Sequence, residues 1–177
     1  IVEQLLVKVN LWEHRKNAVA SYSGGMRQRF GIAQCLIGDP KLVIVDEPTA
    51  GLDPGERNRF YNILSEIGEN IIVILSTHIV QDVRELCTQM AVMNHGKVLF
   101  SGNTDEALLE VKDKVWERKV TKTELAAYQN DYKVISNKLV GGNPLIHIFS
   151  ETEPGNGFVK AEENLEDVFF AKLNELV

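Results

Sequence analysis

The sequence predicts an α/β fold that is followed by a smaller α+β unit. Segments with helical and strand-like patterns alternate over residues 1–108, which is typical of a parallel sheet covered by helices. Two of the strand-like segments, Leu42–Val45 and Ile71–Leu75, are continuous apolar runs of the kind found in strands that are buried on both faces. The pattern changes after Val111, where several strands surround one short helix. We therefore expect two domains, at residues 1–108 and 109–177.

The larger domain is expected to contain helices with recognisable ends. Apolar residues within Ile1–Val9 recur at the spacing of one helix face. Ser23 is a suitable N-cap for a second helix, which the Gly-Asp-Pro sequence at 38–40 ends. Pro54 suits the first turn of a third helix, and Gly68 suits its end. The other elements expected here are a helix at Val80–Cys87, strands at Met90–Met93 and Val98–Phe100, and a short helix containing Leu108 and Leu109.

The smaller domain is expected to combine a sheet with a closing helix. Strand-like patterns occur at Val115–Val120, Tyr132–Leu139 and Leu145–Phe149, and a short helix is expected around Glu124–Ala127. The closing helix places apolar residues on one face, and either Asn164 or Glu163 stands near its start.

Composition limits the possible functions. The 177 residues are 44% hydrophobic, which is enough for one domain with a core, or for part of a domain with a small second one. The formal charge of −6 argues against a nucleic-acid surface, because such surfaces gather basic side chains. Cys35 and Cys87 are the only cysteines, which favours a reducing, cytosolic setting. The longest apolar run, Ile71–Leu75, is far shorter than the roughly 18 residues that span a bilayer, so a membrane role requires a partner.

Two carboxylates follow the first buried strand. Asp46 and Glu47 come directly after Leu42–Val45, at the strand end where open α/β sheets bind ligands. Neighbouring side chains point in different directions at a strand end, so the two carboxylates are expected to have different roles. Asp46 is placed to hold a hydrated Mg²⁺, and Glu47 to orient or deprotonate a water molecule. Taken alone, this stretch is more often only an acidic turn.

Two further sites have a physical basis in the sequence. Gly24 and Gly25 leave backbone N–H groups uncovered at the start of a helix, which forms an anion site to which Ser23 adds a hydroxyl. His78 lies just past the second buried strand, in the same position relative to the sheet as Glu47. A lone histidine is usually structural, and that interpretation is kept for the three others, which lack the spacing of zinc ligands: His14, His95 and His147.

Four motifs occur in an order that resembles the ATPase domain of ABC transporters, which has a P-loop NTPase-like (RecA-like) fold. They are the signature loop 23–29 (SGGMRQR, with Met26 where the family more often has Gln), the Walker B motif 42–48 (LVIVDEP), the D-loop 51–54 (GLDP) and the switch histidine in 76–78 (STH). The resemblance covers about Val2 to Leu109. It implies ATP and Mg²⁺ as cofactors, with Asp46 on the metal, Glu47 and His78 in catalysis, and Ser23, Gly24, Gly25 and Asp53 in nucleotide binding.

The same resemblance implies a dimer that holds two nucleotides, in which the signature loop of one subunit meets the ATP of the other. No G-x-x-x-x-G-K-[ST] phosphate-binding loop (Walker A) occurs, and the Gly96-Lys97 pair falls in an expected hairpin turn. The first residues already have a helical pattern, so the chain is expected to be an N-terminally truncated, C-terminal portion of such a domain. By itself it is expected to be inactive.

The segment 164–170 (NLEDVFF) resembles the ending of bacterial ABC ATPases that pair with export permeases of the ABC-2-like type. This implies a transmembrane permease as a partner and a position at the inner face of the cell membrane. The residues themselves require no more than an amphipathic helix that packs on its own sheet. Two alternatives stay open at this point: a non-transport ABC ATPase that acts in DNA repair or on the ribosome, and a non-catalytic fragment.

Overall fold

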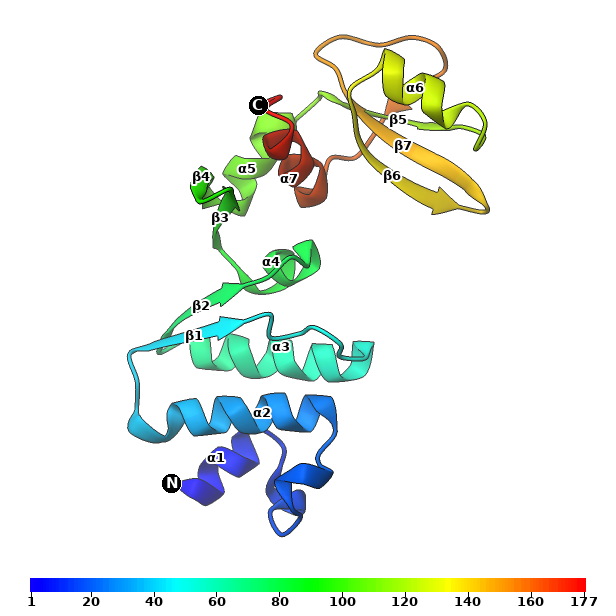
Figure 1. Ribbon diagram of the computed structural model, residues 1–177. Coiled ribbons are helices and arrows are strands. Elements are labelled where there is room, and N and C mark those ends of the chain that lie inside the picture. Colours follow the sequence, from blue (N-terminus) through cyan, green and yellow to red (C-terminus); the bar gives the residue numbers. More distant parts are fainter. The chain divides into compact units, whose positions relative to one another are not determined.

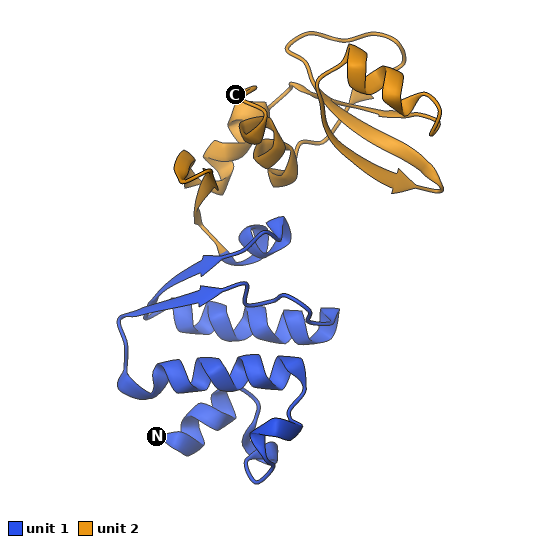
Figure 2. Ribbon diagram, viewed as in Figure 1, with its two compact units in different colours: residues 1–86 blue, residues 87–177 orange.

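The computed structural model describes residues 1–177, which form two compact units (Figure 2). Unit 1 is Ile1–Leu86 and unit 2 is Cys87–Val177. The boundary expected between residues 108 and 109 lies inside α5 (Thr104–Val111) of unit 2. As a statement about separable domains, that boundary stays a prediction.

Unit 1 is an α/β arrangement around two parallel strands (Figure 1). Leu42 pairs with Ile72 at one end of the two strands, and Asp46 pairs with Ser76 at the other. The α/β class expected from the sequence is therefore confirmed. The elements of unit 1 are α1 (Val2–Lys8), α2 (Gly24–Cys35), β1 (Leu42–Asp46), α3 (Pro54–Gly68), β2 (Ile72–Ser76) and α4 (Val80–Leu86), with short 3-10 turns at Trp12–His14, Val19–Ser21 and Leu36–Gly38.

Within unit 1, only one face of the β1–β2 pair is covered by helices. Val45 and Val73 pack against a core that the helices build, with these buried members: Val9, Leu11, Ile32, Phe60, Ile63, Leu64 and Ile67. On the other face Ile44 is 68% and Ile72 is 66% exposed. Apolar runs of this kind are typical of strands that are buried on both faces, but here the second face is exposed, because no helix of unit 1 covers it. The apolar runs predicted the positions of both strands correctly, but the strands are less buried than such runs usually are.

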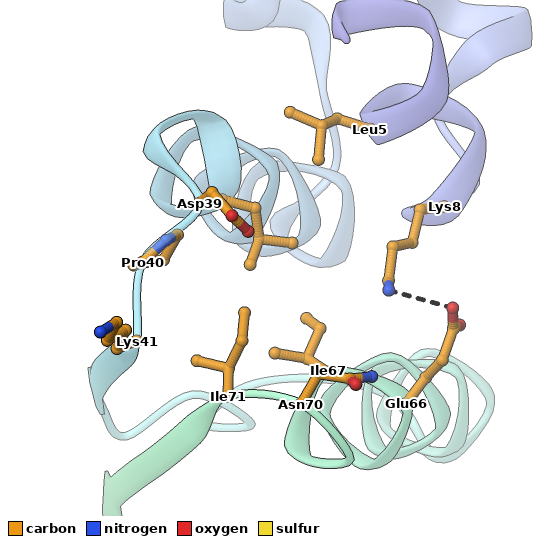
Figure 3. A pocket seen from close by; sticks show the side chains of 10 residues that line it. Leu5, Lys8, Asp39, Pro40, Lys41, Glu66, Ile67, Asn70 and Ile71 are labelled. Atoms are coloured by element: carbon orange, nitrogen blue, oxygen red, sulfur yellow. Dashed lines mark ion pairs between the residues drawn. The ribbon is translucent and has the colours of Figure 1, made fainter.

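A cavity of about 370 Å³ lies near the amino ends of β1 and β2, because Lys41 and Ile71, which line it, directly precede these strands. Figure 3 shows the side chains around it. Leu5, Ile67 and Ile71 line it, and an ion pair of 3.0 Å between Lys8 and Glu66 lies at its edge. Exposed ion pairs contribute little to stability. The cavity brings no group of catalytic side chains together.

Unit 2 contains a hairpin and a four-stranded antiparallel sheet. The strands of the sheet lie in the order β6-β7-β5-β8. The elements are β3 (Gln89–Asn94), β4 (Lys97–Asn103), α5, β5 (Val115–Lys119), α6 (Leu125–Asp131), β6 (Val134–Val140), β7 (Asn143–Phe149), β8 (Val159–Lys160) and α7 (Leu165–Leu173). The two-residue strand β8 had no signal in the sequence, since it is too short for a periodic pattern. No helix in either unit has the length and apolar character that a membrane crossing requires.

The two faces of β7 pack against different partners because side chains alternate along a strand. Ile146 and Ile148 belong to a buried cluster with Phe158, and Tyr128 of α6 packs against it. His147, on the other face, contacts Asp167 of α7. The helix α7 begins at Asn164 with a capping box, so Asn164 rather than Glu163 is the N-cap.

Candidate functional site

The carboxyl ends of β1 and β2 bring the predicted acidic pair and the switch histidine together. The backbone N–H of Glu47 donates to the carbonyl of Ser76 at 2.9 Å, which extends the pairing of the two strands by one residue. Asp46 and Glu47 therefore lie beside the segment that ends in His78. The parallel pairing explains the placement, since parallel strands end at the same edge of a sheet.

Glu47 and His78 form a direct contact. Nδ1 of His78 lies 2.7 Å from Oε1 of Glu47, and the backbone N–H of His78 donates to the same oxygen at 3.2 Å. An ionised carboxylate only accepts hydrogen bonds, so Nδ1 carries the hydrogen in this contact and Nε2 remains available on the other side of the ring. The second oxygen of Glu47, Oε2, is enclosed and has no hydrogen-bond donor in the protein. The pair can therefore hold one carboxylate oxygen in a fixed position.

The backbone of Glu47 is in the left-handed region, with a φ of +45°. For a residue with a Cβ this conformation costs about 1–2 kcal/mol. Two hydrogen bonds hold it: the N–H of Glu47 to Ser76, and the N–H of Ala50 to the carbonyl of Glu47 at 3.2 Å. Strained residues of this kind are concentrated at functional sites. The strain turns the chain so that the Glu47 side chain meets His78.

Asp46 fits the chemistry of a magnesium ligand. Its Oδ1 accepts a hydrogen bond from the hydroxyl of Ser76, and the carboxylate lies at the surface. No three side chains of the His, Cys, Asp or Glu types converge as a metal cage. Mg²⁺ commonly takes only one or two carboxylates and fills its other positions with water and phosphate oxygens. A single carboxylate at a strand end, oriented by a neighbouring hydroxyl, meets that requirement.

The signature segment forms the start of α2. The hydroxyl oxygen of Ser23 accepts from the N–H of Met26 at 3.2 Å, and the first bond along the helix runs from the N–H of Arg27 to the carbonyl of Ser23 at 3.0 Å. The N–H groups of Gly24 and Gly25 precede that bond, so they are among the unpaired donors at a helix start. Ser23 is thus the N-cap, as the sequence predicted.

Gly25 is required by close packing. A Cβ at this position would collide with the carboxylate of Glu56, which Arg29 and Arg59 hold in ion pairs. Gly24, in contrast, faces open space. The second glycine therefore lets the start of α2 approach α3, and the first leaves the approach to the helix end open.

Asp53 has a structural role in α3. Its Oδ1 accepts from the N–H of Glu56 at 2.9 Å, which makes Asp53 the N-cap of that helix. A role of Asp53 in nucleotide binding stays a prediction. Figure 1 shows the starts of α2 and α3 at the same edge of unit 1 as the carboxyl ends of β1 and β2. The hydrogen bond of 3.4 Å from Gln28 to the carbonyl of Ala50 links two of these segments.

A buried acid next to the site was not predicted from the sequence. Asp82 is fully buried, and it accepts hydrogen bonds from side chains of the segments that carry Glu47 and His78. The sequence gives only a weak signal: Asp82 lies two residues into α4, four residues after His78, between Gln81 and Val83. An acid at an apolar helix position requires a partner, but the sequence does not say which one.

Known proteins with similar sequences include ATP-binding proteins of ABC transporters. Residues 1–50 match the family described as ABC transporter. The uncharacterized ABC transporter ATP-binding protein YxlF of Bacillus subtilis is 29% identical over 95% of the chain and 62% of its own length. The methionine import ATP-binding protein MetN 2 of Oceanobacillus iheyensis is 32% identical over 85% of the chain and 45% of its own length. The chain thus spans less than two thirds of these relatives.

Solved structures share the fold. The structure of cbiO1 from Clostridium perfringens, described as part of the ABC transporter complex cbiONQ, is 32% identical with a TM-score of 0.57 over 62% of this chain and 44% of that one. A putative metal-chelate type ABC transporter has the same TM-score at 22% identity, over 85% of this chain and 56% of that one, which shows the fold alone. By the matched segment, the relatives and the solved structures, this chain is similar to ATP-binding proteins of ABC transporters.

Proposed function

We propose that this chain belongs to an ATP-hydrolysing subunit of an ABC transporter and contributes the residues that act on the attacking water and the terminal phosphate. The observation that carries the proposal is the contact of Glu47 with His78, next to Asp46, at the carboxyl ends of two parallel strands. Ligands of open α/β sheets bind at that edge. The substrate is ATP, and Mg²⁺ is its metal.

Glu47 is the group that positions or deprotonates the attacking water. Transfer of a phosphoryl group to water depends mainly on positioning and on stabilisation of negative charge, so a fixed carboxylate is well suited to the task. His78 holds Oε1 of Glu47 through Nδ1, and Nε2 is free to donate or accept at the terminal phosphate. Asp46 holds Mg²⁺, which neutralises phosphate charge when bound. The exposed position of His78 makes such a contact accessible to a ligand.

The start of α2 binds the phosphate of a nucleotide held by a second subunit. The unpaired N–H groups of Gly24 and Gly25, the helix dipole and the Ser23 hydroxyl together favour an anion. The resemblance to ABC ATPases implies that Glu47 and His78 act on a different nucleotide from the one bound there, so the proposed active unit is a dimer with two ATP molecules. Asp53, at the start of α3, lies toward the same interface. ATP closes the dimer and hydrolysis reopens it.

The transporter partner is a transmembrane permease, which places the subunit at the cytoplasmic face of the cell membrane. We propose export as the direction, because the segment 164–170 that forms the start of α7 matches the ending typical of export-type subunits. MetN 2 is named as an import protein, so import is the competing outcome. Transport assayed in membrane vesicles with the subunit on the outside decides between them, since export then appears as ATP-dependent accumulation inside.

The test of the proposal is Glu47→Gln in the full-length protein that contains this chain. The amide keeps the size of the side chain and removes its charge and basicity. ATP turnover should fall by roughly 10²- to 10⁴-fold, the range for loss of a general base. ATP binding should survive, and the dimer should accumulate in MgATP when its size is measured. Turnover near the parental rate, or failure to form an ATP-dependent dimer, would show that Glu47 is not the catalytic carboxylate.

A further inference from the structure

Three hydroxyl groups converge on one buried carboxylate in unit 1. Asp82 of α4 is 0% exposed. Its Oδ2 accepts from the hydroxyl of Thr49 at 2.6 Å and from that of Thr77 at 2.9 Å. Its Oδ1 accepts from the hydroxyl of Tyr61, in α3, at 2.7 Å. Thr49, Tyr61 and Thr77 come from three different segments, and Asp82 joins them.

The donors match the needs of a buried carboxylate. A charged carboxylate removed from water is costly unless it is hydrogen-bonded, and here both oxygens have neutral hydroxyl donors. Burial raises the pKa of Tyr61, and the hydrogen bond to Asp82 raises it further. The phenol therefore stays protonated and keeps donating at physiological pH. Hydrogen bonds to a charged acceptor are about twice as strong as neutral ones.

The positions of the donors tie Asp82 to the candidate catalytic pair. Thr49 is two residues after Glu47, and Thr77 directly precedes His78. The hydroxyl of Thr77 also accepts from the N–H of Ile79 at 2.9 Å, so His78 is held on both of its flanks. Asp82 thus links the segment after β1 to the segment after β2, in the interior beside the contact between Glu47 and His78.

We infer that Asp82 is a positioning residue, which sets the orientation of His78 against Glu47 and so controls the rate of hydrolysis. This inference rests on the proposed function. Asp82 reaches no ligand itself, because it is fully buried. It acts by fixing the two segments whose side chains are exposed to the nucleotide, where small displacements of reacting groups have large effects on rate.

The experiment uses Asp82→Asn in the full-length protein, with ATP turnover and thermal unfolding measured on the same preparation. The amide keeps the shape but weakens the hydrogen bonds from the hydroxyls. We expect kcat to fall by roughly 10- to 100-fold while KM for ATP changes little.

The matched control is Asp167→Asn, which alters an equally buried and hydrogen-bonded carboxylate in unit 2. It should lower stability as well but leave kcat unchanged. If Asp82→Asn lowers only the unfolding temperature, the inference is wrong.

A second set of variants removes one hydroxyl at a time, so that folding is preserved. Thr77→Val cuts the link to His78, and Tyr61→Phe cuts only the link to α3. We expect the first to lower kcat more than the second. In a His78→Ala background, Thr77→Val should have no further effect on kcat, because its influence passes through His78. Equal effects of Thr77→Val and Tyr61→Phe, or full additivity with His78→Ala, would overturn the inference.

The outcomes also separate the inference from the function on which it rests. If Glu47→Gln abolishes turnover but Asp82→Asn leaves kcat intact, the inference alone fails. If Glu47→Gln retains turnover, the proposed function fails, and the role of Asp82 fails with it.

Discussion

Each unit of the protein contains a histidine that contacts a carboxylate, and the two contacts have nearly the same geometry. Nδ1 of His78 lies 2.7 Å from Glu47 in unit 1, and Nδ1 of His147 lies 2.8 Å from Asp167 in unit 2. The side chains of the first pair are 75% and 37% exposed, and those of the second are 11% and 1% exposed. The first pair can reach a ligand, whereas the second can only stabilise the fold. Exposure, rather than geometry, separates the two roles.

The buried pair joins α7 to the sheet of unit 2. The second oxygen of Asp167 accepts from the backbone N–H of Asn164 at 3.1 Å and from its side-chain amide at 2.8 Å. His147 in β7 thus holds the residue that completes the capping box of α7. The carboxylate of Glu117 lies 3.4 Å from the other ring nitrogen of His147. The hydrogen bond to Asp167 raises the pKa of His147 against the opposing effect of burial.

The largest expected difference between the units concerns nucleotide binding. Glu47 and His78 in unit 1 can act only on a bound nucleotide, but the sequence of the chain contains no phosphate-binding loop. We expect the 177-residue chain alone to bind MgATP with a dissociation constant weaker than about 100 μM, roughly −5.5 kcal/mol. Calorimetric titration measures this directly. A tighter constant that Asp46→Asn weakened would contradict the prediction and show that the chain holds a complete site.

The next largest effect is expected from His78→Ala in the full-length protein. Removal of the imidazole frees Glu47 and removes the contact to phosphate, so ATP turnover should fall by roughly 100-fold or more. The unfolding temperature should not change, because the side chain is mostly exposed. The double variant with Glu47→Gln should be no slower than Glu47→Gln alone, since residues that act as a unit are not additive. If the two substitutions reduced ATP turnover by factors that multiply in the double variant, Glu47 and His78 would act separately.

His147→Ala is expected to have the reverse effect. It leaves Oδ1 of the buried Asp167 without its contact to His147, which costs about 3 kcal/mol of the free energy of unfolding of unit 2. Turnover of the folded full-length protein should be unchanged. In the 177-residue chain with Trp12→Phe, Trp116 is the single tryptophan, so urea unfolding followed by its fluorescence reports on unit 2. Loss of turnover without loss of stability would break the distinction between the two pairs.

The exposed site was largely predictable from the sequence, for a physical reason. Side chains that follow two parallel strands lie at the same edge of the sheet, so Glu47 and His78 were expected together, and the contact of 2.7 Å agrees. Ser23 was predicted as a cap because capping is local and depends on residues three or four apart. Local signals and strand order were therefore enough for these parts.

The buried contacts were not predictable. Asp82 meets Thr49 across 33 residues, and His147 meets Asp167 across 20. Such pairs depend on how helices dock onto strands, which periodicity does not specify. The exposure of one face of the strands, with Ile44 on it, has a related cause. An apolar run indicates that a strand can be covered on both faces, but the cover itself must come from other segments.

The smallest expected effect is a dependence of the stability of unit 2 on pH. The pKa of His147 is raised in the folded protein, so the folded state binds a proton more tightly than the unfolded state, whose histidine titrates near pH 6.5. The resulting stabilisation is fully present below about pH 6.5 and is lost as the pH rises through the folded-state pKa. Besides Asp167, the charged groups that act on His147 are Glu117, which favours the proton, and Lys138, which opposes it.

The urea midpoint reported by Trp116 should therefore decrease as the pH rises from about 6.5 through the folded-state pKa of His147. The variant His147→Gln cannot titrate there, so it should lack this decrease. His78→Gln serves as the control and should leave the pH profile of unit 2 unchanged. If His147→Gln left the pH dependence of the urea midpoint unchanged, other groups would cause it, and the contact with Asp167 would not raise the pKa of His147.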